Sequence, residues 1–196
     1  MKELLNEWRK FLREEDSKSS YKLVDKLTET KETIPKFRED LETAEKEKIV
    51  DLTIKTIPSQ ESVYAALNKP DFKLSDIDMS PRQSKKSKPG RLTVGLYSAD
   101  KDVVKKVYLG AESPKYGAYL YEIKLKPGTK FVDYRGTEPG NTGFEASRIF
   151  EKEQKYYLDK SVQVVIGKDR GNIQYAILDK KIISEITMIE SAEKTI

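Results

Sequence analysis

The sequence predicts a mixed α+β domain that follows a helical extension at the N-terminus. Before residue 50, apolar residues recur at helical spacing between many Lys and Glu residues. From about residue 90, short segments alternate apolar and polar residues between turn residues, which is typical of β-strands. We therefore expect an amphipathic helix over 1–16, a charged helical segment over 17–48, a main domain over 49–190 and a tail over 191–196.

The composition excludes several kinds of chemistry. The 196 residues include no cysteine and no histidine, which rules out disulfides, thiolate metal sites, cysteine nucleophiles and histidine bases. The 37 basic and 33 acidic residues nearly balance, so net charge gives weak support for nucleic acid binding. No run approaches the roughly 18 apolar residues of a membrane span, and the charged start Met1–Glu3 is unlike a secretory signal. We expect a soluble protein that has no membrane partner and is not secreted through a signal peptide.

Three helical patterns precede the main domain. The helix over 1–16 has an apolar face that consists of Leu4, Leu5, Trp8, Phe11 and Leu12. After a serine-rich joint, a brief pattern runs from Tyr21 to Leu27. A longer pattern runs from Phe37 to Leu52, with Thr33 as its N-cap and Pro35 in its first turn.

The main domain is predicted to begin with a strand over 52–57 and a capped helix over 59–67. A strand over 92–97 then leads to a short helix that is capped by Asp100 and ended by Gly110. The remaining elements are a strand over 119–125, a turn at Pro127–Gly128, a strand over 129–133, a helix over 146–157, and closing strands over 162–166, 173–178 and 182–189, the first two joined by a hairpin turn at 168–172.

The first helix resembles the N-terminal leaders of internal head proteins of large tailed phages. In that family a protease cuts after a Leu-x-Glu pattern, and Leu12-Arg13-Glu14 is similar to it. The resemblance implies capsid association through this helix, and a location in the host cytoplasm or the phage virion. The alternative is that the helix docks on the main domain.

Three segments of the main domain, in order along the chain, resemble ADP-ribosyltransferases of the His-Tyr-Glu type. They are GLYSAD at 95–100 followed by Val103, Val104 and Tyr108; GAYLYEIKLKPGTKFVD at 117–133; and VVIG at 164–167 with IQYAILD at 173–179. The resemblance implies two split β-sheets with flanking helices around a cleft that holds NAD. It also implies transfer of ADP-ribose from NAD, the substrate, to a protein or nucleic acid acceptor.

The same resemblance implies a set of site residues. Tyr97 matches the tyrosine that stacks on nicotinamide, Tyr108 matches a second and usually structural aromatic residue, and Gln174 stands at the position of the catalytic glutamate. Arg91 closes a basic loop over 80–91 that lies over the cofactor cleft in the family. That loop is equally consistent with a solvated surface segment.

Two motifs depart from the family pattern. Gln174 can bind a ribose hydroxyl group, but it has no negative charge to stabilise an oxocarbenium-like transition state. The first motif requires a histidine that the chain lacks, and the alignment places Ala65 and Ala66 there. Lys55 or Ser59 fits the role of the missing anchor, and the sequence does not decide between them.

Two functions remain open. One is an NAD-dependent ADP-ribosyltransferase with Tyr97 and Gln174 in the catalytic positions. The other is a catalytically inactive relative that acts as a binding or virion-associated protein. Tyr134-Arg135-Gly136-Thr137 imitates the Arg-Gly motif of a sister class, but it follows the tyrosine segment, so we interpret it as a turn. No metal site is predicted, because closely spaced acidic residues such as Asp76 and Asp78 are typical of surface turns.

Overall fold

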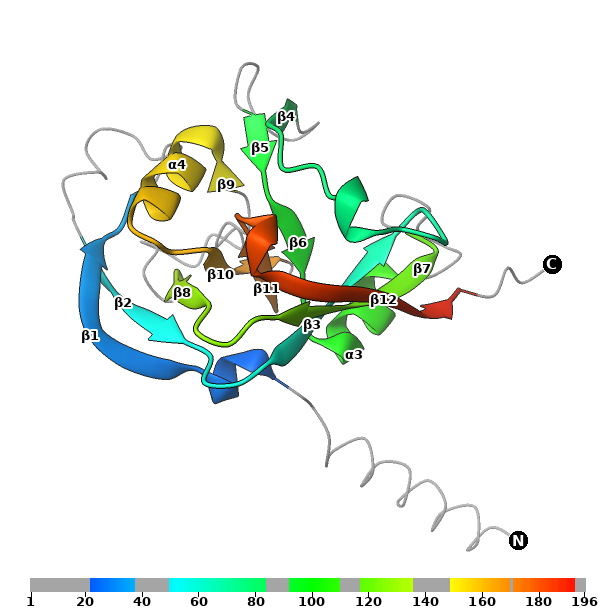
Figure 1. The fold of residues 1–196 in the computed structure, drawn as a ribbon, viewed down its shortest axis with the longest axis horizontal. Helices are drawn as coiled ribbons and strands as arrows, with labels where there is room; N and C mark the ends of the chain where they lie inside the picture. The colour runs from blue at the N-terminus through cyan, green and yellow to red at the C-terminus, as the bar shows by residue number, and fades with distance from the viewer. Residues whose placement is uncertain are drawn as a thin grey trace, which may run out of the picture.

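A computed structural model describes residues 22–37, 50–83, 92–109, 117–135, 149–169 and 171–192 (Figure 1). These residues form a mixed α+β fold that consists mostly of sheet, which confirms the predicted class at that level. The predicted leader over 1–16 with its Leu12–Glu14 motif, most of the helix predicted from Phe37, and Arg91 lie outside the described residues.

The largest sheet has six strands in the order β1-β2-β8-β10-β11-β6. Its β8 and β10 are parallel, and its other neighbouring strands are antiparallel. The bounds are β1 (Thr28–Pro35), β2 (Asp51–Thr56), β6 (Leu96–Ser98), β8 (Lys130–Asp133), β10 (Val164–Asp169) and β11 (Asn172–Ile177).

Two smaller sheets complete the β-structure. An antiparallel sheet has the order β12-β7-β3, and a short one has the order β4-β5-β9. A single bridge between Tyr64 of β3 and Ala99 joins the three-stranded sheet to the chain that leaves β6. The bounds are β3 (Glu61–Leu67), β7 (Tyr119–Leu125), β12 (Ile183–Ser191), β4 (Arg82–Gln83), β5 (Leu92–Val94) and β9 (Ile149–Phe150).

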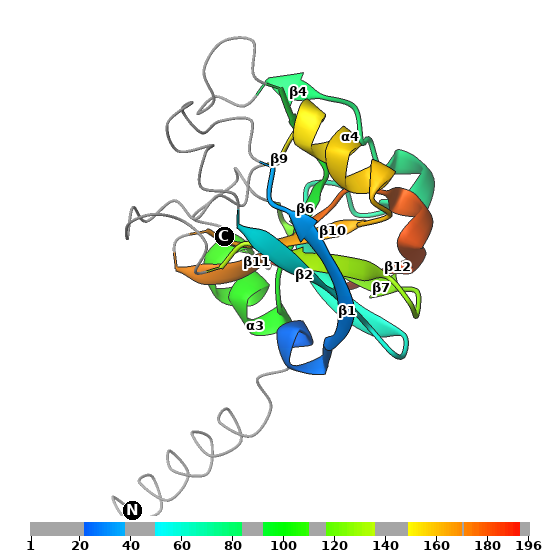
Figure 2. The same ribbon diagram turned by 90° about the vertical axis from the view of Figure 1, so that its left-hand side faces the viewer.

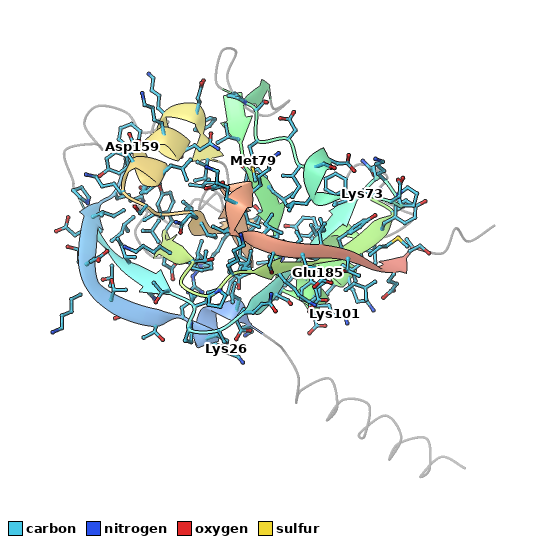
Figure 3. The ribbon with its side chains drawn as sticks, viewed as in Figure 1. Lys26, Lys73, Met79, Lys101, Asp159 and Glu185 are labelled. Carbon is cyan, nitrogen blue, oxygen red and sulfur yellow. The ribbon has the colours of Figure 1, made fainter. Side chains whose placement is uncertain are left out.

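Helical elements are short, and they lie at the ends and flanks of the sheets (Figure 1). The α-helix α4 and the α3–η3 segment, in which a π-helical turn follows α3, lie well apart in both views (Figures 1 and 2). Asp159 of α4 and Lys101 of α3 mark these two elements in Figure 3. The bounds are η1 (Leu23–Lys26), η2 (Leu74–Asp76), α3 (Lys101–Val103), η3 (Val104–Tyr108), α4 (Glu151–Asp159) and η4 (Lys180–Ile182).

The two larger sheets pack on each other through one apolar core. We call the side of the six-stranded sheet that meets the three-stranded sheet its inner face. The inner face contributes Phe131, Val164, Ile166, Tyr175 and Ile177, and the three-stranded sheet contributes Val63, Ala65, Ile123, Leu125 and Ile183. The space between the sheets is therefore filled by side chains, most of which are fully buried.

The opposite side of the six-stranded sheet, its outer face, has its own core. Val132, Val165 and Ala176 of this face pack with Tyr157 of α4 and Ile149 of β9. A third cluster, with Val104 and Tyr108 of η3, covers Leu120 of the three-stranded sheet. Residues alternate between the two faces of a strand, so the pairing register assigns each strand residue to one face.

Gly95 divides the strand that the sequence predicts over 92–97 into two strands of different sheets, β5 and β6. Its φ is 93°, a conformation that residues with a Cβ seldom adopt. A Cβ at this position would lie 2.8 Å from the carbonyl oxygen of Ile177. The close approach of β11 therefore requires glycine here.

Several predicted elements differ from the structure. The helix predicted over 59–67 is wrong, because these residues form β3, in which Val63 and Ala65 are buried at a spacing of two. The helical segment predicted over 17–48 is wrong where it is described: Thr33 and Pro35 lie in β1, and only η1 is helical. The helix predicted over 146–157 begins later, because Ile149 and Phe150 form β9.

The other described strands agree with prediction within a few residues. The predicted strand over 52–57 is β2, and the strand over 119–125 is β7. The turn at Pro127–Gly128 and the strand over 129–133 are present, the latter as β8. The three closing strands are β10, β11 and β12, with β10 and β11 paired as the predicted hairpin.

Candidate functional site

Tyr97 and Gln174 lie side by side on neighbouring strands of the six-stranded sheet. Tyr97 of β6 pairs with Ala176 of β11, and Gln174 is two residues away along β11. Both side chains therefore point to the outer face as diagonal neighbours, and both are partly buried. The partner of Gln174 on its other side is Gly167 of β10, which has no side chain to cover it.

The hydroxyl group of Tyr97 contacts β9, the short strand that leads into α4. The backbone N–H of Ile149 in β9 donates a hydrogen bond to it, at 3.0 Å. The ring also packs against the core of the outer face. Tyr97 is thus fixed between β6 and β9, the strand that leads directly into α4. The residue is only partly buried.

Tyr108 reaches the same face from η3. It is only 8% exposed, and its hydroxyl group donates a hydrogen bond to Oδ2 of Asp169 at 2.8 Å. Asp169 is the last residue of β10 and, by alternation, shares the outer face with Gly167. The hydrogen bond therefore fixes Tyr108 next to the end of the β10–β11 hairpin that carries Gln174.

Lys55 is not part of this group. It pairs with Phe131 of β8, which belongs to the inner-face core, so Lys55 points away from Tyr97 and Gln174. Its Nζ lies 3.4 Å from Oε1 of Glu29 and 3.9 Å from Oδ2 of Asp133. The structure therefore does not support Lys55 as an anchor for a ligand on the outer face.

The alternative anchor and the alanine pair also lie elsewhere. Ser59 is in the exposed turn between β2 and β3, where its hydroxyl group donates to Oε1 of Glu61 at 3.1 Å. Ala65 is buried in the core between the sheets, and Ala66 packs against the η3 cluster. None of these residues contributes a polar group to the outer face.

Arg135 follows β8 in the part of the predicted turn that is described, and Gly136 and Thr137 lie outside the described residues. Its Nε and Nη2 donate to the two carboxylate oxygens of Asp133 at 2.9 and 2.7 Å. Asp133 pairs with Ile166 on the inner face, and its hydrogen bonds raise the pKa of Arg135. This bidentate pair is an internal contact on the inner side of the sheet.

Asp169 is a site residue that the sequence reasoning missed. The sequence places it within the predicted hairpin turn over 168–172, whereas β10 extends through it. Continuing the two-residue period of Val165 and Gly167 by one step would have assigned Asp169 to the face of Gln174. It is the only charged residue that β6, β10 and β11 place on the outer face.

A buried polar pair lies on the inner side, next to η1. The predicted N-cap Asp100 does precede α3, but its side chain turns inward instead of capping the helix. Its Oδ1 accepts hydrogen bonds from the hydroxyl group of Tyr175, at 2.9 Å, and from the backbone N–H of Leu23, at 3.2 Å. Burial raises the pKa of both Asp100 and Tyr175.

The outer-face group offers defined chemistry. The partly buried ring of Tyr97 can stack on a flat ring, and a positively charged ring gains further attraction to its face. Tyr108 is only 8% exposed, so its ring offers no face for stacking. The Gln174 amide and the Asp169 carboxylate can bind hydroxyl groups, and Asp169 adds one negative charge. In the described ranges there is no group of three or more acidic, histidine or cysteine residues that could hold a metal ion. No helix within those ranges is both long and apolar enough to cross a membrane.

Comparison with known proteins gives no match: no protein-family model, curated protein or solved structure is similar to this chain at a significant level.

Proposed function

We propose that the protein binds NAD on the outer face of the six-stranded sheet and transfers ADP-ribose from it, in the manner of ADP-ribosyltransferases. One observation carries the proposal. Tyr97 and Gln174 come from the first and third segments of the resemblance, yet they lie on one face of one sheet, and Tyr108 of η3 hydrogen-bonds Asp169 on that face. Lys55, which was assigned only to fill a missing motif, lies on the other face.

The proposed binding mode follows from the residue types. The nicotinamide ring of NAD is cationic, so it favours the faces of tyrosine rings. The amide of Gln174 can hold a ribose hydroxyl group. The ligand lies on the outer face, between the elements that hold Tyr97 and Tyr108, because side chains fill the space between the two larger sheets.

Thermal unfolding with NAD tests the binding step. NAD at one hundred times its dissociation constant would stabilise the folded protein by about 2.7 kcal/mol, which raises the unfolding midpoint. Tyr97→Ala is expected to abolish most of this shift. The control is Tyr119→Ala, because Tyr119 is also a partly buried strand tyrosine but belongs to β7. An unchanged midpoint of the wild-type protein in millimolar NAD would refute the proposal.

The amide at position 174 also favours a second function, NAD binding without transfer. Removing one electrostatic partner of a transition state slows catalysis by roughly a hundredfold to a thousandfold. Incubation with labelled NAD and a cell lysate separates the two functions. Label on a macromolecule indicates transfer, release of free ADP-ribose indicates hydrolysis, and binding without either product indicates a binding protein.

A further inference from the structure

We propose that Asp169 supplies the negative charge that Gln174 lacks, so that the catalytic carboxylate of this protein stands on β10 instead of β11. The inference rests on the proposed NAD-dependent function. It adds a residue that the resemblance does not assign. Its support comes from the register of the β10–β11 hairpin and from the Tyr108 contact.

The register places Asp169 within reach of the same ligand atoms as Gln174. Gln174 pairs with Gly167, and Asp169 lies two residues further along β10 on the same face. Such diagonal neighbours have Cα atoms roughly 7–8 Å apart, a distance that one ribose can bridge. Gly167, between them on this face, is itself buried and adds no side chain between the two groups.

The carboxylate is also held in position. The Tyr108 hydroxyl group donates to its Oδ2 at 2.8 Å, and Tyr108 itself is anchored in the buried η3 cluster. Asp169 is partly buried, so its charge is less screened than that of a fully exposed residue. A fixed charge acts on a transition state without the cost of reorienting solvent.

The chemical step requires this charge. The bond between the nicotinamide nitrogen and ribose C1′ breaks, and its electron pair leaves with neutral nicotinamide. Positive charge then develops on C1′ and the ring oxygen. A lone pair of the acceptor, or of water, forms the new bond to C1′, and the acceptor loses its proton to solvent. A nearby carboxylate opposes the transient positive charge, as in glycoside hydrolysis.

Asp169→Asn tests the role of the charge, and Tyr108→Phe tests the role of the hydrogen bond that holds the carboxylate. Asn keeps the size of the side chain and can still accept the Tyr108 hydrogen bond, whereas Phe removes the hydrogen bond and keeps the carboxylate. We expect Asp169→Asn to slow transfer or NAD hydrolysis roughly a hundredfold to a thousandfold while the NAD-induced thermal shift persists. Tyr108→Phe should also slow the rate, because it loosens the carboxylate, but by less than Asp169→Asn, because the charge remains. Equal losses in the two variants would mean that Asp169 only positions Tyr108, which would overturn the proposal.

Gln174→Glu supplies an independent measurement. In the Asp169→Asn background, Gln174→Glu should raise the rate at least tenfold above that of Asp169→Asn alone, because it returns a carboxylate to the neighbouring position. In the wild-type background, where a charge is already present, the gain should stay below tenfold. A gain of a hundredfold or more in wild type would show that Asp169 contributes no charge, and this readout remains valid if Asp169→Asn does not fold.

The outcomes separate this inference from the function on which it rests. Wild-type protein that does not bind NAD overturns both. Wild-type protein that binds NAD but neither transfers nor hydrolyses it overturns the role of Asp169 and leaves the binding function intact.

Discussion

At the scale of single residues, Asp100 shows how a buried carboxylate makes stability depend on pH. Burial raises the pKa of Asp100, although hydrogen bonds from Tyr175 and Leu23 act in the opposite direction. Near η1, the charge of Lys22 lowers the pKa of Asp100 and the charge of Asp25 raises it, both by smaller amounts. Because the folded-state pKa lies above the ordinary value of about 3.9, the folded state binds the proton more tightly than the unfolded state. The free energy of unfolding therefore falls as pH rises from the unfolded-state pKa of this group through its raised folded-state pKa.

Asp100→Asn keeps an oxygen acceptor for Tyr175 and Leu23 but removes the titration. We expect the free energy of unfolding of the variant, relative to wild type, to increase as pH rises from about 4 towards neutrality. The slope cannot exceed about 1.4 kcal/mol per pH unit for one proton. Urea unfolding at several pH values measures it, with Asp102→Asn as an exposed control. A difference that does not vary with pH would show that Asp100 does not titrate in this window.

Gly95 is the residue that allows β5 and β6 to belong to different sheets. Gly95→Ala combines a positive φ of 93° with a Cβ placed 2.8 Å from the Ile177 carbonyl oxygen. Gly128→Ala is a matched control, because its φ is 77° and nothing lies within 4 Å of the added Cβ. The conformational cost common to both is about 1–2 kcal/mol. We expect Gly95→Ala to lower the thermal midpoint clearly more than Gly128→Ala, and equal losses would contradict the steric argument.

At the scale of elements, tyrosine hydroxyl groups fix the chain where it leaves β1. The Tyr157 hydroxyl group accepts from the N–H of Phe37 at 2.8 Å and donates to its carbonyl oxygen at 3.1 Å. Tyr134 donates to the same carbonyl oxygen at 3.0 Å. The rings of Phe37 and Tyr156 stack with centroids 5.1 Å apart. The end of the edge strand is thereby tied to α4 and β8.

Tyr157→Phe should loosen this connection. The partly buried N–H of Phe37 loses its acceptor, so we expect a cost at or below the low end of the about 1–3 kcal/mol for an unsatisfied buried group. Tyr156→Phe is the control, because its hydrogen bond to the Pro35 carbonyl oxygen is exposed. Amide hydrogen exchange at Phe37 should accelerate in Tyr157→Phe and change little in Tyr156→Phe. An unchanged exchange rate at Phe37 in Tyr157→Phe would rule out this role of the hydroxyl group.

The elements also show where sequence patterns succeed and fail. β7 and β11 were predictable because their residues alternate and glycine or proline marks their ends. β3 was mistaken for a helix because Val63, Ala66 and Leu67 are spaced as on a helix, whereas pairing with β7 decides the structure. Local propensity is overridden there by contacts that are distant in sequence. β1 is rich in Thr and Glu and mostly exposed, so its apolar residues are too few to predict a strand.

The candidate site was predictable in part for a related reason. Tyr97, Tyr108 and Gln174 occupy positions that a resemblance can mark. The register brings Tyr97 and Gln174 to one face, and Tyr108 contacts Asp169 of that face from η3. The face of Asp169 follows from the two-residue period of β10, whereas the opposite orientation of Lys55 depends on how β2 aligns with β8. A single sequence does not encode that register in any local pattern.

At the scale of the whole molecule, one core joins the two larger sheets, so they should unfold together. Ile123 of β7 is fully buried between the sheets, and Ile123→Ala should cost about 2–5 kcal/mol. Ile189 of β12 is 44% exposed, so Ile189→Ala should change stability by only about 0.5 kcal/mol. Tyrosine signals and backbone circular dichroism should follow one shared transition. Two separate transitions would mean that the sheets form independent units.

The position of β1 at the margin of the six-stranded sheet has a practical consequence for anyone who trims the chain. A fragment that starts at residue 49, the boundary suggested by sequence patterns, would leave the backbone amides and carbonyls of β2 without the partners that Thr28–Pro35 provide. Unpaired backbone groups at the edge of a sheet favour strand exchange between molecules. The fragment should therefore precipitate or form intertwined dimers, although every residue implicated in ligand binding would still be present.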